Sequence, residues 1–282
     1  MPPTVPSRTA AAARAAHPLV DSPPHLHTDP SAVRLLGDQA DELIGYHLRH
    51  GAHPVLAGAR LQVACRARFA QTRLADAVRA GVRQHVVLGA GLDTSGYRPD
   101  RDPAVQVFEV DHAGTQSWKL DRLRAAGIPV PPSVRHVPAD LETDALIECL
   151  TARGFRPREQ ALISWLGCTM YLSRAGLRRT LIAIAGLAPG TELVLDYLLP
   201  RALQDELGRS YADAVATFSA EQGEPWLSQF SPDELADLLT GCGLSPVRDV
   251  SQRDAVEAAL WDRSDSLRPS ALQRLAVARV PG

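Results

Sequence analysis

The feature that most constrains the fold is a glycine loop that directly follows a short apolar run. Residues 85–91 read HVVLGAG, and a second strand-like run at residues 105–111, VQVFEVD, ends in an acid. Glycine in such a loop lets the backbone turn tightly and lets a ligand approach the main chain, because a Cβ would block both. The pattern is typical of α/β proteins that bind an adenosine-containing cofactor.

Strand-like and helical segments alternate along the middle of the chain. Three further strands are predicted at residues 134–140, 161–167 and 192–198, with helices at residues 112–126, 142–153, 173–186 and about 200–222. This alternation indicates a parallel sheet wound by right-handed crossovers. The late runs SPVRDVS and QRLAVARV are expected to close the sheet, and Ser231 with Glu234 predicts a capping box at the start of a helix.

The first 82 residues lack strand-like runs and divide into two parts. Residues 1–30 contain seven prolines and few large apolar side chains, which predicts a mobile arm. Three histidines in that arm, His17, His25 and His27, are interpreted as incidental, so no metal site is expected. Helical spacing from Ser31 onward, with a long helix at residues 59–79, predicts a helical lid over residues 31–82 within a single domain of residues 31–282.

Composition excludes several classes of protein. The formal net charge is −2 and the basic residues are scattered, so nucleic acid and anionic membranes are not expected partners. The four cysteines show no C-x-x-C spacing, which argues against a disulfide framework or a zinc ribbon. There is no apolar run of about 20 residues and no apolar core of a signal peptide, so we expect a cytoplasmic protein.

Acids at the ends of the second and third strands indicate the kind of ligand. Asp111 lies twenty residues after Gly91, the spacing at which a carboxylate reaches ribose hydroxyls in both NAD enzymes and S-adenosyl-L-methionine (SAM) enzymes. The third glycine of the dinucleotide fingerprint is replaced by Thr94, and Pro99 argues against a long helix at the loop. A pyrophosphate site is therefore weakened, and SAM, which has no pyrophosphate, is favoured.

Five motifs together carry a resemblance to a known family. They are RARF at residues 66–69, RQHVVLGAGLDTSGYR, FEVDH with Trp118 and Lys119 beyond it, VPADL, and SWLGCTMYL. With these motifs the chain resembles the bacterial branch of the leucine carboxyl methyltransferase family of SAM-dependent O-methyltransferases, from about residue 35 to the C-terminus. The resemblance implies a class I, Rossmann-like α/β fold with a mostly parallel seven-stranded sheet and an N-terminal helical lid.

The resemblance also implies a set of cofactor-binding residues. The methionine part of SAM would pass the loop of Gly89, Ala90 and Gly91, and the ribose would bind Asp111. The adenine would lie between Asp140 and Leu141, and the carboxylate of SAM would meet Arg66 or Arg68. A guanidinium binds a carboxylate bidentately, but the sequence leaves open which arginine does so.

One position departs from the family pattern. Members that methylate protein phosphatases have a glutamate five residues before the tyrosine of SWLGCTMYL, where this chain has Leu166. We therefore expect a small-molecule acceptor, with natural-product biosynthesis as one interpretation, rather than a protein C-terminus. The nucleophile is left open between a carboxylate, which needs no base at neutral pH, and a hydroxyl, which benefits from one.

The candidate catalytic residues are His112, a possible base directly after the ribose aspartate, and Tyr171, which could line the acceptor pocket. Three other aromatic residues, Trp165, Tyr211 and Trp226, are weaker candidates. Two alternatives are an NAD(P)-dependent oxidoreductase and a non-catalytic SAM-binding relative. A serine hydrolase is not expected, because no G-x-S-x-G elbow occurs.

Overall fold

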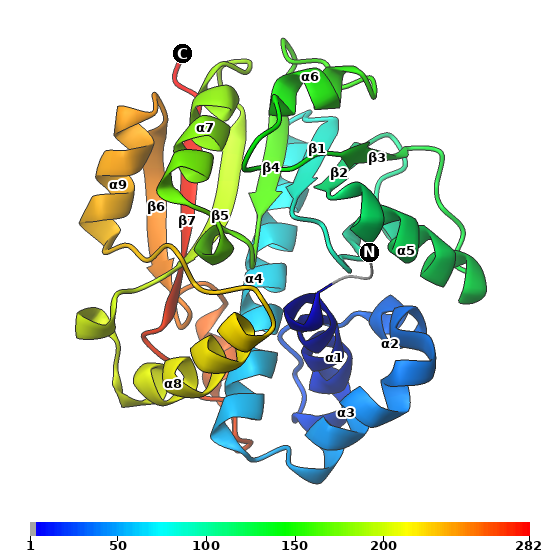
Figure 1. The fold of residues 1–282 in the computed structure, drawn as a ribbon, viewed down its shortest axis with the longest axis vertical. Helices are drawn as coiled ribbons and strands as arrows, with labels where there is room; N and C mark the ends of the chain where they lie inside the picture. The colour runs from blue at the N-terminus through cyan, green and yellow to red at the C-terminus, as the bar shows by residue number, and fades with distance from the viewer. Residues whose placement is uncertain (1–3) are drawn as a thin grey trace.

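The computed structural model describes residues 4–282, which form a seven-stranded sheet covered by helices (Figure 1). The strand order is β3-β2-β1-β4-β5-β7-β6, and only β7 runs against its neighbours. The strands are β1 Gln84–Leu88, β2 Gln106–Asp111, β3 Val134–Pro138, β4 Ala161–Trp165, β5 Glu192–Leu198, β6 Ser245–Ser251 and β7 Gln273–Arg279. The predicted mostly parallel sheet and its two late strands are confirmed.

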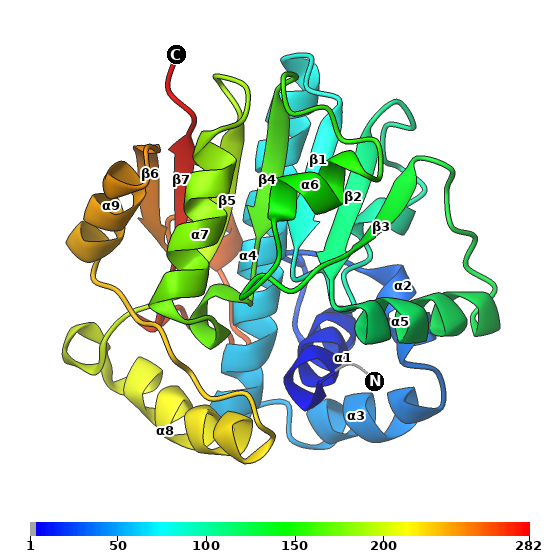
Figure 2. The same cartoon turned by 45° about the horizontal axis from the view of Figure 1, so that its top comes forward.

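Helices cover both faces of the sheet and its carboxyl end (Figure 2). Their bounds are α1 Val5–Val20, α2 Pro30–Leu36, α3 Ala40–Arg49, α4 Pro54–Arg79, α5 Ala113–Ala125, α6 Leu146–Thr151, α7 Arg174–Ala185, α8 Glu206–Glu221 and α9 Pro232–Gly241. Leucines of α6, α7 and α9 form the main core with β1, β4 and β5, while α4 packs on the opposite face. These three strands are buried along their whole length, which explains why most of their residues are apolar.

The connection from β1 to β2 contains no long helix. After the glycine loop the chain makes only the 3₁₀ turn Ser95–Tyr97, which agrees with the helix-breaking effect expected of Pro99. Alanines of α1, including Ala12 and Ala16, instead pack in one cluster with Val87 of β1. The N-terminal helix therefore lies beside the glycine loop.

The predicted mobile arm is wrong for the described residues from Thr4 onward. Residues 5–20 form α1, whose first turn contains Pro6 and whose N-cap Thr4 accepts a hydrogen bond from the Ser7 backbone N–H. Proline fits the first turn of a helix because its missing N–H has no partner there. Alanines favour helix, and their small side chains allow close burial. His17, expected to be incidental, is fully buried. Residues 1–3 of the predicted arm lie outside the described residues.

The region predicted as a helical lid contains α2, α3 and α4. The last of these begins at Pro54 rather than at residue 59, so it is one turn longer than predicted. Its residues Phe69 and Ala70 pack against Leu162 of β4 and Val194 of β5. The helix therefore forms part of the layer that covers the sheet, and a lid function for residues 31–82 stays a proposal.

Candidate functional site

A cavity of about 1440 Å³ lies at the carboxyl ends of the parallel strands, between the sheet and the helices α1, α4 and α8. Sites for one small ligand usually measure about 300–1,000 Å³. The cavity is therefore large enough for a cofactor together with a second molecule. Among the helices described, none is long and apolar enough to cross a membrane.

The glycine loop forms one wall of the cavity, and both of its glycines are needed there. Gly89 has a φ of +63° and Gly91 a φ of +43°, a backbone region that side chains disfavour. A Cβ on Gly89 would lie 2.7 Å from Cys168 Sγ, and one on Gly91 would lie 2.8 Å from Ser7 Oγ. The loop is thus held between the segment after β4 and helix α1, and its backbone faces the cavity.

The acid at the end of β2 is fixed by backbone hydrogen bonds. Asp111 Oδ2 accepts from the Gly91 N–H at 2.6 Å, and Asp111 Oδ1 accepts from the His112 N–H at 2.7 Å. A carboxylate has about four lone-pair sites, so two sites are left for a ligand's hydroxyls. Asp140 and Leu141, from the loop after β3, line the same cavity as Asp111. The structure therefore brings the three predicted residues of the nucleoside end together.

The structure distinguishes the two candidate arginines. Arg66 lines the cavity, and its guanidinium is so close to Gly167 that a Cβ there would lie 2.5 Å from Nη2. Arg68 instead pairs with Glu257 at 2.7 Å and does not line the cavity. Successive helical residues are rotated by about 100°, so two residues place the side chains on nearly opposite sides of α4. Only Arg66 is brought to the predicted site.

Sequence analysis missed Asp196, which supports this end of the cavity. Its side chain is fully buried on β5, and it accepts hydrogen bonds from the Gly167 N–H at 2.7 Å and from Gln273 Nε2. Arg66 Nη1 is 3.4 Å from Asp196 Oδ2, which leaves most of the guanidinium donors unused by this contact. Burial raises the pKa of Asp196. The signal in the sequence was an acid inside an apolar strand, ELVLDYL.

A second polar pair on the sheet was also missed. His85 Nε2 lies 2.9 Å from Ser164 Oγ, which joins β1 to β4, and both side chains line the cavity. Burial lowers the pKa of His85 to about 4, so the imidazole is neutral at pH 7. A single histidine at the start of the apolar run HVVLG gives no sign in the sequence that its side chain points into a cavity.

The candidate catalytic residues lie in different surroundings. His112 is exposed at the N-cap of α5, and Tyr171 lies in the 3₁₀ turn Thr169–Tyr171 after β4; both line the cavity. Burial raises the pKa of the Tyr171 phenol. Of the weaker aromatic candidates, Tyr211 and Trp226 line the cavity, whereas Trp165 is fully buried in the core. In residues 4–282 no group of three or more possible ligands is placed to hold a metal ion.

Comparison with known proteins identifies the family. The fold is that of the Rossmann-like methyltransferases, and the sequence model of the family described as leucine carboxyl methyltransferase matches residues 7–185. The chain belongs to this family, as the resemblance predicted. The match begins inside α1, so residues 7–30 of the segment predicted as a mobile arm are part of the family domain.

Curated relatives carry concordant names. A candidate SAM-dependent methyltransferase of Bacillus subtilis strain 168, YktD, is 31% identical over 206 residues, or 72% of this chain and 67% of that protein. One of Parafrankia sp. strain EAN1pec is 41% identical over 48% of this chain and 43% of its own length. A third, of Mycobacterium sp. strain JLS, is 36% identical over 48% and 44%. The match thus spans less than half of the last two proteins.

Solved structures agree on the fold. A candidate methyltransferase from Thermobifida fusca covers 100% of this chain and 96% of its own with a TM-score of 0.62 at 19% identity. A protein of the DUF574 family from Streptomyces avermitilis covers 96% of this chain and 97% of its own with a TM-score of 0.60 at 18% identity. At these identities the likeness concerns the fold alone.

Proposed function

We propose that this chain is a SAM-dependent O-methyltransferase that acts on a small molecule. The observation that carries the proposal is that Arg66 of α4 and Asp111 at the end of β2 line one cavity, together with the glycine loop after β1. A cationic fork suits the carboxylate of SAM, and a fixed strand-end carboxylate suits its ribose. Bound SAM supplies an electrophilic methyl group, and the protein's contribution is to bind and orient the two reactants.

The glycine loop supports SAM over a dinucleotide. Pyrophosphate is usually held by the N-terminus of a long helix that follows such a loop. Here a single 3₁₀ turn, Ser95–Tyr97, follows, and the next long helix begins only after β2. Gly91 can present one backbone N–H, but that N–H already donates to Asp111. The loop is therefore poorly suited to NAD(P), and the names of the relatives favour SAM as well.

We propose a small-molecule acceptor because aromatic side chains line the part of the cavity beyond Arg66. Leu166, at the position of the phosphatase-branch glutamate, lines the cavity and packs with the apolar cluster between α4 and the sheet. An apolar residue there removes an acidic contact and leaves an apolar surface. Such a cavity favours a small acceptor with a large apolar part over a charged peptide.

The nucleoside end is tested by changing Asp111→Ala. The variant loses charge-assisted hydrogen bonds, each worth about 1.5–3 kcal/mol, so SAM affinity is expected to fall at least about tenfold. Calorimetric titration with SAM measures the change. The matched control is Asp121→Ala on α5, because Asp121 pairs only with the exposed Arg124 and lies outside the cavity. Equal SAM affinity in the two variants would contradict the assignment of Asp111.

A further inference from the structure

The part of the cavity beyond Arg66 is an aromatic chamber. It is lined by side chains from the 3₁₀ turn after β4, from β5, from α8 and from the loop after α8: Met170, Tyr171, Leu198, Tyr211, Phe218 and Trp226. Two backbone hydrogen bonds to Met170 O, from Leu227 N at 2.7 Å and Ser228 N at 3.2 Å, fix the loop after α8 against the turn. The chamber therefore has a defined shape that suits a flat apolar group.

Helix α4 completes the chamber with a small residue and a polar one. A Cβ on Gly58 would lie 2.9 Å from the Tyr211 ring, so the glycine allows that ring to pack directly on the helix. Gln62 follows one turn later on the same side of α4 and also lines the cavity. Its side chain faces the Tyr211 phenol.

Two buried N–H groups in this chamber have no hydrogen-bond partner within the described residues. They are Gln62 Nε2 and Trp226 Nε1. Gln62 is only 8% exposed, and the Trp226 indole lies near the Tyr171 phenol. A buried donor without a partner costs about 1–3 kcal/mol, so two in one chamber indicate that a ligand normally accepts from them.

The polar groups of the chamber supply several hydrogen-bond donors. Burial raises the pKa of Tyr171 and raises the pKa of Tyr211 to about 12, so both phenols keep their protons at neutral pH. The Arg66 guanidinium adds positive charge near both phenols. The charge of Glu224 acts on Tyr171, and burial raises the pKa of Glu224. A chamber that offers several donors is complementary to a ligand group rich in oxygen acceptors.

We propose that the aromatic chamber binds the methyl acceptor as an aromatic carboxylic acid, with Gln62 and Trp226 donating to its carboxylate. The inference rests on the proposed function and names the substrate class of the same site. The ring lies among the aromatic side chains, and one carboxylate oxygen is held by the two N–H groups. The second oxygen is left free to react.

The reaction that follows is balanced without a base. The free carboxylate oxygen attacks the methyl carbon of SAM, a carbon–oxygen bond forms, and the carbon–sulfur bond breaks with its electron pair going to sulfur. The sulfonium cation becomes a neutral thioether and the carboxylate anion becomes a neutral methyl ester. No proton moves, so neither His112 nor a tyrosine is needed as a base. Gln62 and Trp226 select and orient the acceptor.

The test uses a probe that offers both nucleophiles on one ring. The enzyme is incubated with SAM and 4-hydroxybenzoate, and the products are separated by chromatography and identified by mass spectrometry. Methyl 4-hydroxybenzoate, the ester, is the expected product, and 4-hydroxybenzamide is expected not to react. Formation of 4-methoxybenzoate, or methylation of the amide, would overturn the inference. So would the absence of transfer to every member of a panel of one-ring and two-ring arenecarboxylates at millimolar concentration.

Two variants test the named donors. Trp226→Phe keeps an aromatic ring but removes the N–H, and Gln62→Leu keeps the approximate size but removes the amide. Each is expected to raise the KM for the arenecarboxylate at least about tenfold, while SAM affinity changes less than about twofold. Trp118→Phe, on α5 outside the cavity, is the matched control. Unchanged KM values would overturn the inference, whereas a wild-type protein that fails to bind SAM would overturn the proposed function itself.

Discussion

Replacing Arg60 with leucine is expected to lower the free energy of unfolding by about 3–5 kcal/mol, because the change leaves a buried carboxylate without its cationic partner. Arg60 is fully buried on α4, and its guanidinium binds Asp21 through two hydrogen bonds, Nε to Oδ2 at 2.7 Å and Nη2 to Oδ1 at 2.9 Å. Asp21 is itself only 5% exposed. Chemical denaturation at pH 7 measures the loss.

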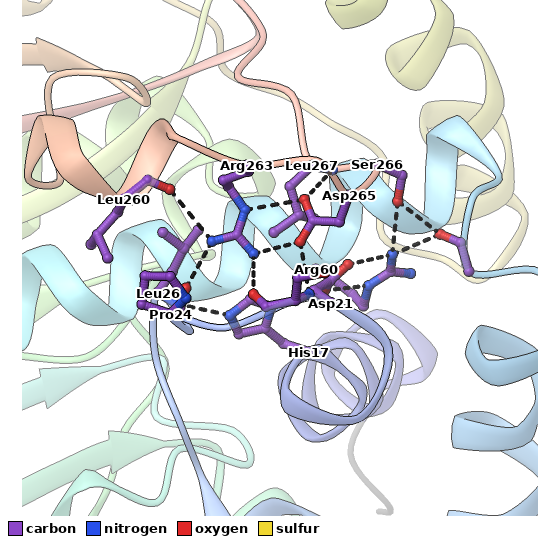
Figure 3. A network of polar contacts seen from close by, with 12 residues as sticks. His17, Asp21, Pro24, Leu26, Arg60, Leu260, Arg263, Asp265, Ser266 and Leu267 are labelled. Atoms are coloured by element: carbon purple, nitrogen blue, oxygen red, sulfur yellow. Dashed lines mark hydrogen bonds and ion pairs between the residues drawn. The ribbon is translucent and has the colours of Figure 1, made fainter.

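The surroundings of this pair explain why the effect should be large (Figure 3). His17 Nδ1 lies 2.8 Å from Asp21 Oδ2, and His17 Nε2 accepts from the Leu26 N–H at 3.0 Å. On the other side Arg263 donates to the backbone oxygens of Ser22 and Pro24. The network therefore joins the end of α1 to α4 and to the segment before β7, and its loss loosens three parts of the fold.

Two controls make the stability prediction specific. Arg68→Leu, on the same helix, removes the partly exposed pair with Glu257 and is expected to cost about 1 kcal/mol or less. Adding Asp21→Asn to Arg60→Leu removes the uncompensated charge and should restore part of the loss. Equal destabilisation by Arg60→Leu and Arg68→Leu would show that the buried network is not a major source of stability.

The effect of Arg60→Leu should also depend on pH. Burial alone would raise the pKa of Asp21, but hydrogen bonds from His17 and Arg60 hold it below its ordinary value of 3.8. A carboxyl whose pKa is lowered in the folded state adds stability above its unfolded pKa and loses that contribution as pH falls through its folded pKa. The difference between wild type and variant should therefore be full at pH 7 and shrink below pH 3.8.

The second large effect is expected at the methionine end of the cofactor site, from Arg66→Leu. Truncating one partner of a hydrogen-bonded charge pair costs about 2–5 kcal/mol, so SAM affinity should fall at least about 30-fold. Arg66 contacts Asp196 only at 3.4 Å, and Asp196 keeps its hydrogen bonds from the Gly167 N–H and Gln273, so most of the stability should be retained. Calorimetric titration measures SAM affinity, and thermal unfolding checks stability.

The neighbouring arginine again provides the control. Arg68→Leu carries the same change two residues away but points away from the cavity, so its SAM affinity should equal that of the wild type. The reverse result, with affinity lost in Arg68→Leu and kept in Arg66→Leu, would contradict the placement of the carboxylate contact. Loss in both variants without loss of folding would show that the helix as a whole, rather than one side chain, positions the ligand.

Local patterns in the sequence predicted most of the sheet. The apolar run before Gly89 and the acid at Asp111 fixed two adjacent strand ends, because parallel strands bring their carboxyl ends to one edge. The capping box of Ser231 and Glu234 was also predicted and is present. These features depend on residues close together in the chain, which is why sequence reasoning could identify them.

Features that depend on distant residues were not predicted. Helix α1 has an alanine-rich sequence whose burial needs α3, α4 and the glycine loop, so its prolines were misinterpreted as signs of disorder. The choice between Arg66 and Arg68 needed the rotation of α4 against the sheet. Gln62 and Trp226 line the same cavity only because α8 packs across α4. No sequence spacing encodes that contact.

The most direct test of the central claim is a calorimetric titration of the wild-type protein with SAM, with its demethylated product S-adenosylhomocysteine, and with NAD and NADP. The glycine loop without a following helix, the fixed Asp111 carboxylate and the available Arg66 guanidinium together predict micromolar binding of the first two ligands. They predict weak or undetectable binding of the dinucleotides. Tight binding of NAD or NADP with no response to SAM would contradict the account.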